Sequence, residues 1–155
     1  MRPLNTTMAC LQSKRWLLAI AFAVTSLASG SVEAKAPKGR YTIANGEVTD
    51  NMTGLIWRQT LNPGAVVFAD VATVCTGLAN GPWRVPNIKE LATLIDESTN
   101  GPAIDIEAFP KTPVAAMWSS TPDARDAKYA FAVDFAFGDT GHYVVGTTFQ
   151  VRCVK

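Results

Sequence analysis

YAFAVDFAF, residues 129–137, gives the clearest secondary-structure signal in this 155-residue chain. Aromatic or β-branched residues occupy every second position, and alanine or aspartate stands between them. A strict two-residue alternation places the two sets on opposite faces of a β-strand. Residues 138–141, GDTG, predict a turn into a second strand at 142–145. The stretch therefore predicts an antiparallel hairpin in the C-terminal part of the chain.

Segments on both sides extend this pattern. We expect further strands at residues 40–48, 55–58, 116–120 and 147–154. Asn45-Gly46 and the stretch 49–54 are turn signals, so the first two of these segments predict an early hairpin. In the last segment Phe149, Val151 and Cys153 share one face.

Two helices are predicted between the early hairpin and the C-terminal strands. The first covers residues 67–79, where apolar residues recur at steps of three and four: Phe68, Val71, Cys75 and Leu78. The second begins after Asn87, a good capping residue, with Glu90 at the reciprocal position of a capping box. Helices first and an antiparallel sheet last indicate an α+β domain.

The first 34 residues have the pattern of a signal peptide. Lys14-Arg15 precede an apolar run over 16–27, which is shorter than the ~20 residues of a membrane-spanning helix. Val32 and Ala34 stand at positions −3 and −1 of a cleavage site before Lys35. A buried helix of the mature fold is the alternative, but it does not account for both the basic start and the small residues at the end.

With cleavage at that position, we expect the chain to have three parts. We expect residues 1–34 to be removed on export to the periplasm or the cell exterior, with Met8 as an alternative start. Residues 35–39 are expected to form a flexible lead-in, and residues 40–155 the folded domain. No later apolar run reaches membrane-spanning length.

The net charge and the cysteine content exclude some classes of function. The leader holds three of the 14 basic and one of the 13 acidic residues, which leaves 11 and 12 and a net charge of −1. This balance is unlike that of a nucleic-acid binder. Cys75 and Cys153 remain after the leader, and an even pair in an oxidising compartment predicts a disulfide. A metal site would need more cysteine or histidine nearby.

An ordered series of short motifs resembles the Lcl C-terminal domain family, once called domain of unknown function 1566. The motifs are TGLIW at 53–57, GPWRVPNIKEL at 81–91, WSSTP at 118–122, YAFAVDFAFG at 129–138 and VRCVK at 151–155. The resemblance implies a C-type-lectin-like fold related to formylglycine-generating enzymes, with two helices packed on a small antiparallel sheet. It also implies a disulfide between the first helix and the last strand.

The resemblance bears on function only in part. The best-known family member is the tip of a collagen-like bacterial adhesin, which binds sulfated glycosaminoglycans as a trimer. This chain lacks the collagen repeat, so neither the ligand nor the oligomeric state can be carried over.

Loop residues are the first candidates for ligand contact. The loop over 122–128 carries Arg125 and Lys128, and Lys111 could join them in a shallow basic spot for an anionic ligand. Solvated surface charges are the alternative interpretation. Trp83-Arg84 could stack on and pair with a sulfated sugar, but a core tryptophan and a paired arginine are the interpretation we favour.

Acidic residues near the second helix suggest a weaker candidate. Asp96, Glu97 and Asp105 could supply hard oxygen ligands to calcium. Their spacing matches no loop motif with ligands at fixed offsets, and exposed carboxylates at a helix end are common. We therefore expect no obligatory cofactor.

Enzymatic interpretations find little support. His142 is the single histidine, and Ser119 or Ser120 could act as a nucleophile only if the fold brought His142 and a carboxylate to them. Oxidase chemistry of the formylglycine-generating type needs reactive cysteines, whereas both are expected in the disulfide. We therefore expect no catalytic residues and an exported module that binds a glycan or sulfated polysaccharide. A protein-interaction domain of the cell envelope is the alternative.

Overall fold

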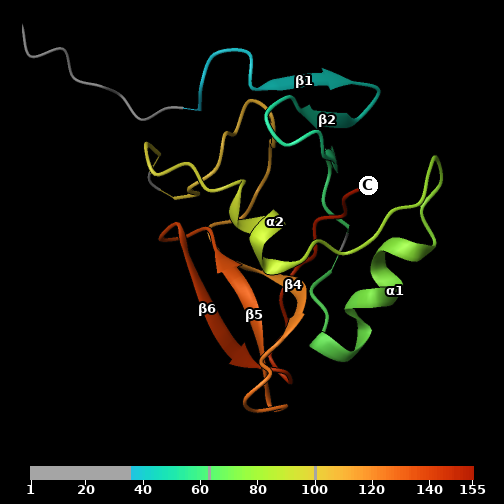
Figure 1. The fold of residues 1–155 in the computed structure, drawn as a ribbon, viewed down its shortest axis with the longest axis vertical. Coiled ribbons are helices and arrows are strands. Elements are labelled where there is room, and N and C mark those ends of the chain that lie inside the picture. Colours follow the sequence, from blue (N-terminus) through green and yellow to red (C-terminus); the bar gives the residue numbers. More distant parts are fainter. Residues whose placement is uncertain (1–35, 63, 100) are drawn as a thin grey trace, which may run out of the picture. The chain divides into compact units, whose positions relative to one another are not determined.

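The computed structural model describes residues 36–62, 64–99 and 101–155 (Figure 1). The predicted signal peptide, residues 1–34, lies outside the described residues. The elements are β1 Tyr41–Ala44, β2 Glu47–Asp50, β3 Ile56–Arg58, the 3₁₀ turn η1 Phe68–Asp70, α1 Val71–Thr76, α2 Ile88–Ala92, β4 Ala116–Pro122, β5 Tyr129–Asp134 and β6 Asp139–Val144. No described helix is long and apolar enough to cross a bilayer.

The strands form two antiparallel sheets rather than the single sheet that we expected. β1-β2-β3 make the first sheet, and β4-β5-β6 make the second. Asn45 and Gly46 join β1 to β2 with φ angles of 54° and 77°. Both values lie in the left-handed region that two-residue hairpin turns require, so the strand expected over 40–48 is itself a hairpin. The predicted hairpin between 40–48 and 55–58 is confirmed by the antiparallel pairing of β2 with β3. Short helices and small antiparallel sheets confirm the α+β class.

Both predicted helices are present but shorter than the sequence pattern indicated. Thr76 ends α1, and the chain then reaches Asn80 and Gly81, both with positive φ angles. Val71 and Cys75 are buried, so the predicted apolar face is confirmed. α2 starts with the predicted capping box: the side chains of Asn87 and Glu90 each accept the other's backbone N–H at 2.9 Å.

The turn between β5 and β6 lies earlier than predicted. Asp134 ends β5: its carbonyl accepts the N–H groups of Phe137 and Gly138, and its carboxylate accepts that of Ala136. The turn therefore covers 135–138, whereas Gly141 already pairs with Ala132 inside the ladder. The prediction of a turn at 138–141 was wrong, because the Asp134 carboxylate closes the turn before the glycine-rich stretch begins.

The C-terminal segment is extended, but it is not the regular closing strand predicted over 147–154. It forms isolated bridges with separate segments: Phe149 with Val66, Gln150 with Met117, and Val154 with both Trp57 and Arg84. Because its partners change every few residues, no continuous ladder develops. In Figure 1 this dark-red segment runs between the first sheet and α1.

Two apolar clusters lie on opposite faces of the β4-β5-β6 sheet. Val133 and Met117 pack with Leu91 and Leu94 of the α2 region. Ala132 and Trp118 belong to the other cluster, which contains α1 and part of the C-terminal segment. The disulfide between Cys75 and Cys153, with Cα atoms 5.7 Å apart, joins α1 to this segment and confirms the predicted pairing.

Candidate functional site

A buried carboxylate organises the loop between β4 and β5. The Asp123 side chain is only 4% exposed, and it holds two cationic or ionisable side chains. Its Oδ1 accepts Nε–H of Arg125 at 3.2 Å, and its Oδ2 accepts Nη2–H at the same distance. The same Oδ2 lies 2.9 Å from Nδ1 of His142. We call Asp123, Arg125, His142 and the neighbouring rings of Tyr129 and Phe131 the Asp123 cluster.

Backbone hydrogen bonds fix the loop that carries this cluster. Asp123 donates its N–H to the carbonyl of Tyr129 at 2.9 Å, and Tyr129 donates to Asp126 at 3.0 Å. The backbone N–H of Arg125 also binds the Asp123 carboxylate. A loop held in this way positions its side chains before any ligand arrives, which lowers the entropic cost of binding.

The hydrogen bonds to Asp123 determine the protonation states of Asp123 and His142. Hydrogen bonds from the Arg125 side chain, and then from His142 and the Arg125 backbone, hold the pKa of Asp123 well below its usual range. The carboxylate is therefore ionised and can only accept. Nδ1 of His142 must then carry a proton, which leaves Nε2 as the nitrogen directed away from Asp123.

Two aromatic rings lie beside the histidine. The rings of Tyr129 and Phe131 lie 5.1 and 6.1 Å from that of His142, at interplanar angles of 31° and 26°. Phe131 and His142 stand directly opposite each other on β5 and β6. The His142 side chain is 51% exposed. The three rings therefore stand side by side with His142 in the middle.

The three predicted basic residues do not form one spot. Arg125 and Lys128 lie in the same loop, where Lys128 is exposed and its backbone N–H binds Asp126. Lys111 precedes β4 and so lies towards the other end of the sheet, where Phe135 hydrogen-bonds to Ala115. β5 is about 17 Å long, and Figure 1 shows the two loops at opposite ends of it.

Two of the three acidic residues considered for calcium, Asp96 and Asp105, accept hydrogen bonds from protein groups, and the third, Glu97, is exposed. Asp96 accepts hydrogen bonds from the N–H and hydroxyl of Ser98 and from the N–H of Ala36. Asp105 accepts two backbone N–H groups of its own turn. Among the described residues, no three His, Cys, Asp or Glu side chains come together in a group that could hold a metal ion.

The tryptophan and arginine of the inter-helix junction have structural contacts. Trp83 is 5% exposed, and its Nε1–H donates to the carbonyl of Ala79. Arg84 makes a bidentate pair with Glu90, at 2.7 and 2.8 Å. These contacts agree with the structural interpretation rather than with a sugar-binding pair.

The serines do not reach the histidine. Ser119 is fully buried, and its hydroxyl donates to the carbonyl of Phe131 at 2.7 Å. Ser120 is exposed and donates its backbone N–H to Pro86. The structure does bring a carboxylate to His142, but that carboxylate is Asp123. Sequence reasoning missed Asp123 and the two rings, although Asp123 and Arg125 at i and i+2 in a loop were a visible signal.

Fold and site together define a small α+β domain with one long-range disulfide and a polar, aromatic cluster at one end of a sheet. Residues 46–155 match the sequence model of the Lcl C-terminal domain, and the chain belongs to this family. No curated protein matches the chain.

Proposed function

We propose that the chain is an exported binding module whose Asp123 cluster holds an acidic group, such as a sulfate ester, of a glycan. The observation that carries this proposal is the shared carboxylate: buried Asp123 orients both Arg125 and His142 at an exposed sheet end. Export is supported by the leader pattern and by the disulfide, which is a feature of oxidising compartments.

The cluster retains donors for a ligand. Asp123 uses Nε and Nη2 of Arg125, so Nη1 stays available on a side chain that is 78% exposed. Arg donors bind sulfate-like and carboxylate groups well because several N–H groups point in one plane. Exposed Lys128 adds positive charge in the same loop, and the rings of Tyr129 and Phe131 offer apolar contact to a sugar.

We further propose that the domain is C-type-lectin-like. Support comes from the family membership and from the disulfide that joins the first helix to the last segment of the chain. In such a scaffold binding is carried by loops, which agrees with a cluster built on the β4–β5 loop.

The test is a glycan array with sulfated polysaccharides and their desulfated counterparts, probed with protein expressed from the full chain, with and without calcium. Arg125→Gln should weaken binding to the sulfated chains about tenfold. Lys111→Gln is the matched control, because it removes one lysine at the other end of the sheet, and it should change affinity less than about twofold. Equal binding of desulfated chains, or no loss in Arg125→Gln, would contradict the proposal.

One exposed ring supports a protein-binding alternative. Phe137 in the β5–β6 turn is 82% exposed, which is unusual for phenylalanine. If this ring anchors a protein partner of the envelope, Phe137→Ser should abolish co-purification of that partner without changing glycan binding. Retention of the partner by Phe137→Ser would argue against this function.

A further inference from the structure

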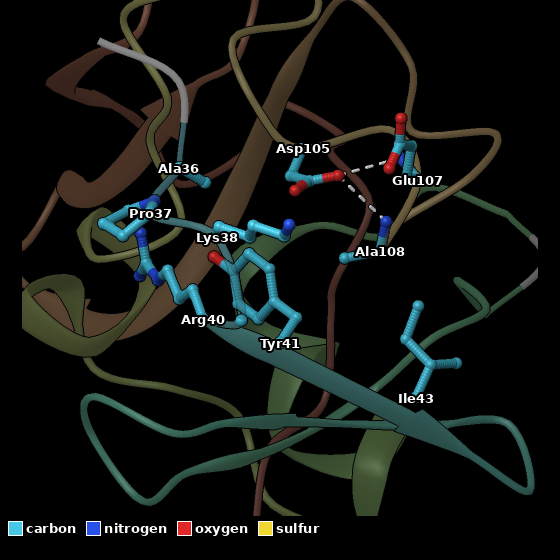
Figure 2. A pocket seen from close by; sticks show the side chains of 10 residues that line it. Ala36, Pro37, Lys38, Arg40, Tyr41, Ile43, Asp105, Glu107 and Ala108 are labelled. Carbon is cyan, nitrogen blue, oxygen red and sulfur yellow. Dashed lines mark hydrogen bonds between the residues drawn. The ribbon is translucent and has the colours of Figure 1, made fainter.

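A cavity of about 540 Å³ opens beside β1, and no residue of the Asp123 cluster lines it (Figure 2). Its walls come from residues 36–40, from β1 and from the turn over 105–108. Residues 36–45 precede the part of the chain that matches the family, so this wall is not accounted for by the family match. We call this cavity the N-terminal pocket.

Hydrogen bonds hold the first wall in place. We expected residues 35–39 to be a flexible lead-in, but the part that the structure describes is attached at both ends. Ala36 donates its backbone N–H to the carboxylate of Asp96 at 3.1 Å. Arg40 donates its backbone N–H to the carbonyl of Pro37 at 2.9 Å, which forms a turn. The Arg40 side chain is bonded to Asp50 and to the carbonyl of Thr93. The pocket therefore has a preformed wall.

One side of the pocket is acidic. Oδ1 of Asp105 accepts the backbone N–H groups of Glu107 and Ala108, at 2.9 and 3.0 Å. These bonds fix the carboxylate and do not use Oδ2. Glu107 lies in the same turn, and both carboxylates line the pocket (Figure 2). A positively charged group entering here would meet an oriented oxygen acceptor.

The other side is basic. Lys38 extends across the opening in the direction of Asp105 (Figure 2). Its ammonium forms no ion pair with any residue that the structure describes. Arg40 also lines this side, but its charge is matched by Asp50. Lys38 is thus the cation that a ligand can engage.

Between the two sides lies an aromatic and apolar surface. Tyr41 packs against Phe109 with ring centres 5.3 Å apart, and the guanidinium carbon of Arg40 lies 4.8 Å from the Tyr41 ring centre. Burial raises the pKa of Tyr41, so its hydroxyl stays protonated and can donate. Ile43, 48% exposed, supplies an apolar rim.

We propose that the N-terminal pocket binds a small zwitterion of the amino-acid class, independently of the Asp123 cluster. The ligand's ammonium binds Asp105, its carboxylate binds Lys38, and an apolar side chain lies against Ile43. A simple anion would be repelled by Asp105, and a simple cation by Lys38. A ligand carrying both charges matches both sides, and the cavity volume falls within the range of small-molecule sites.

The test is an NMR titration of protein expressed from the full chain, with free leucine and the dipeptide leucyl-glycine as probes, at up to about 10 mM. Binding should shift the Tyr41 and Ile43 signals. N-acetyl-leucine lacks the ammonium and leucinamide lacks the carboxylate, so each should bind about tenfold more weakly or worse.

Paired variants assign each end of the ligand. Lys38→Gln should weaken leucine about tenfold but should not weaken leucinamide, and Asp105→Asn should weaken leucine but not N-acetyl-leucine, because each variant removes the charge that repels the derivative. Asparagine keeps Oδ1 as an acceptor for the turn, and an unchanged unfolding curve would verify the fold. Lys89→Gln, on the exposed side of α2, is the control. No shift at Tyr41 and Ile43, or equal binding of leucine, N-acetyl-leucine and leucinamide, would overturn the proposal.

Discussion

The guanidinium carbon of Arg152 lies 4.7 Å above the centre of the Phe109 ring, and Arg152 is fully buried. Nη1 donates to the carbonyls of Arg58 and Gln59, and Nη2 donates to the hydroxyl of Thr112, all at 2.8 Å. Burial lowers the pKa of Arg152 to about 9, which still leaves it charged at neutral pH. A buried cation thus connects the C-terminal segment to β3 and to the loop before β4.

We predict that Arg152→Met lowers the free energy of unfolding by about 3 kcal/mol. Methionine keeps much of the side-chain volume but leaves two buried carbonyls and one hydroxyl without their donor. Urea unfolding followed by fluorescence measures the difference. Lys128→Met, an exposed cation of similar length, should change the same free energy by less than about 0.5 kcal/mol. A neutral Arg152→Met would mean that packing on Phe109 matters more than the hydrogen bonds.

Asp50 should make the domain sensitive to acid. Burial raises the pKa of this fully buried carboxyl, but hydrogen bonds from Arg40 and Met52 outweigh it, so its pKa lies below the usual value. The unfolded chain therefore binds the proton first as pH falls. The stability that Asp50 contributes is complete above about pH 5 and is lost as pH falls through about 4 and below.

The Asp50→Asn variant checks this dependence. It should lower the free energy of unfolding by about 2 kcal/mol at neutral pH and flatten the loss of stability below about pH 4. Unfolding curves at several pH values measure both effects. Asp70→Asn is the control, because Asp70 is exposed and its side chain makes no capping hydrogen bond. If the free energy of unfolding of Asp50→Asn fell with pH as steeply as that of the unchanged protein, groups other than Asp50 would cause the acid sensitivity.

Reduction of the Cys75–Cys153 disulfide should destabilise the domain by about 4 kcal/mol. The bridge joins residues 78 apart, and the chain-entropy estimate for a closed loop of that size gives this magnitude. Denaturant unfolding with and without a reducing agent measures the effect, and the Cys75→Ser, Cys153→Ser double variant should reproduce it. A loss below about 1 kcal/mol would show that the unfolded chain gains little freedom on reduction.

Asn87→Ala should cost about 1 kcal/mol, because it removes one half of the capping box of α2. Asn87→Asp keeps an acceptor oxygen and should retain most of the stability. Thermal unfolding of both variants beside Lys89→Ala, an exposed position on the same helix, gives the comparison. Equal losses in Asn87→Ala and Lys89→Ala would mean that tertiary packing alone fixes the start of α2.

Short-range sequence patterns predicted much of the fold, whereas the candidate site depends on contacts between segments that are far apart in the sequence. Asn45-Gly46 and the Asn87–Glu90 box were predictable because their partners lie within a few residues. The alternating stretch at 129–137 was not sufficient: Phe135 is fully buried, whereas Phe137, two residues later, is 82% exposed. β5 ends at Asp134, before both of these residues, and a two-residue period says nothing about where a strand stops.

For the candidate binding residues too, short-range patterns were informative and contacts between distant segments could not be predicted. Sequence reasoning grouped Arg125 and Lys128, which share one loop, with Lys111, which the length of β5 separates from them; whether any of the three contacts a ligand stays a prediction. It also could not anticipate that Asp123 would bind His142, because these residues lie on different segments that only the β5–β6 pairing brings together.

The sequence by itself determined the α+β class, the Asn45-Gly46 turn, the cap of α2, the family and the cysteine pair, because each depends on short-range pattern or on the count of available partners. Only the tertiary structure decided that Arg152 is buried, that Asp123 organises His142 and Arg125, and that residues 36–40 form the wall of a pocket. The physical reason is that burial and charge pairing depend on which distant segments pack together, and local preference does not specify that packing.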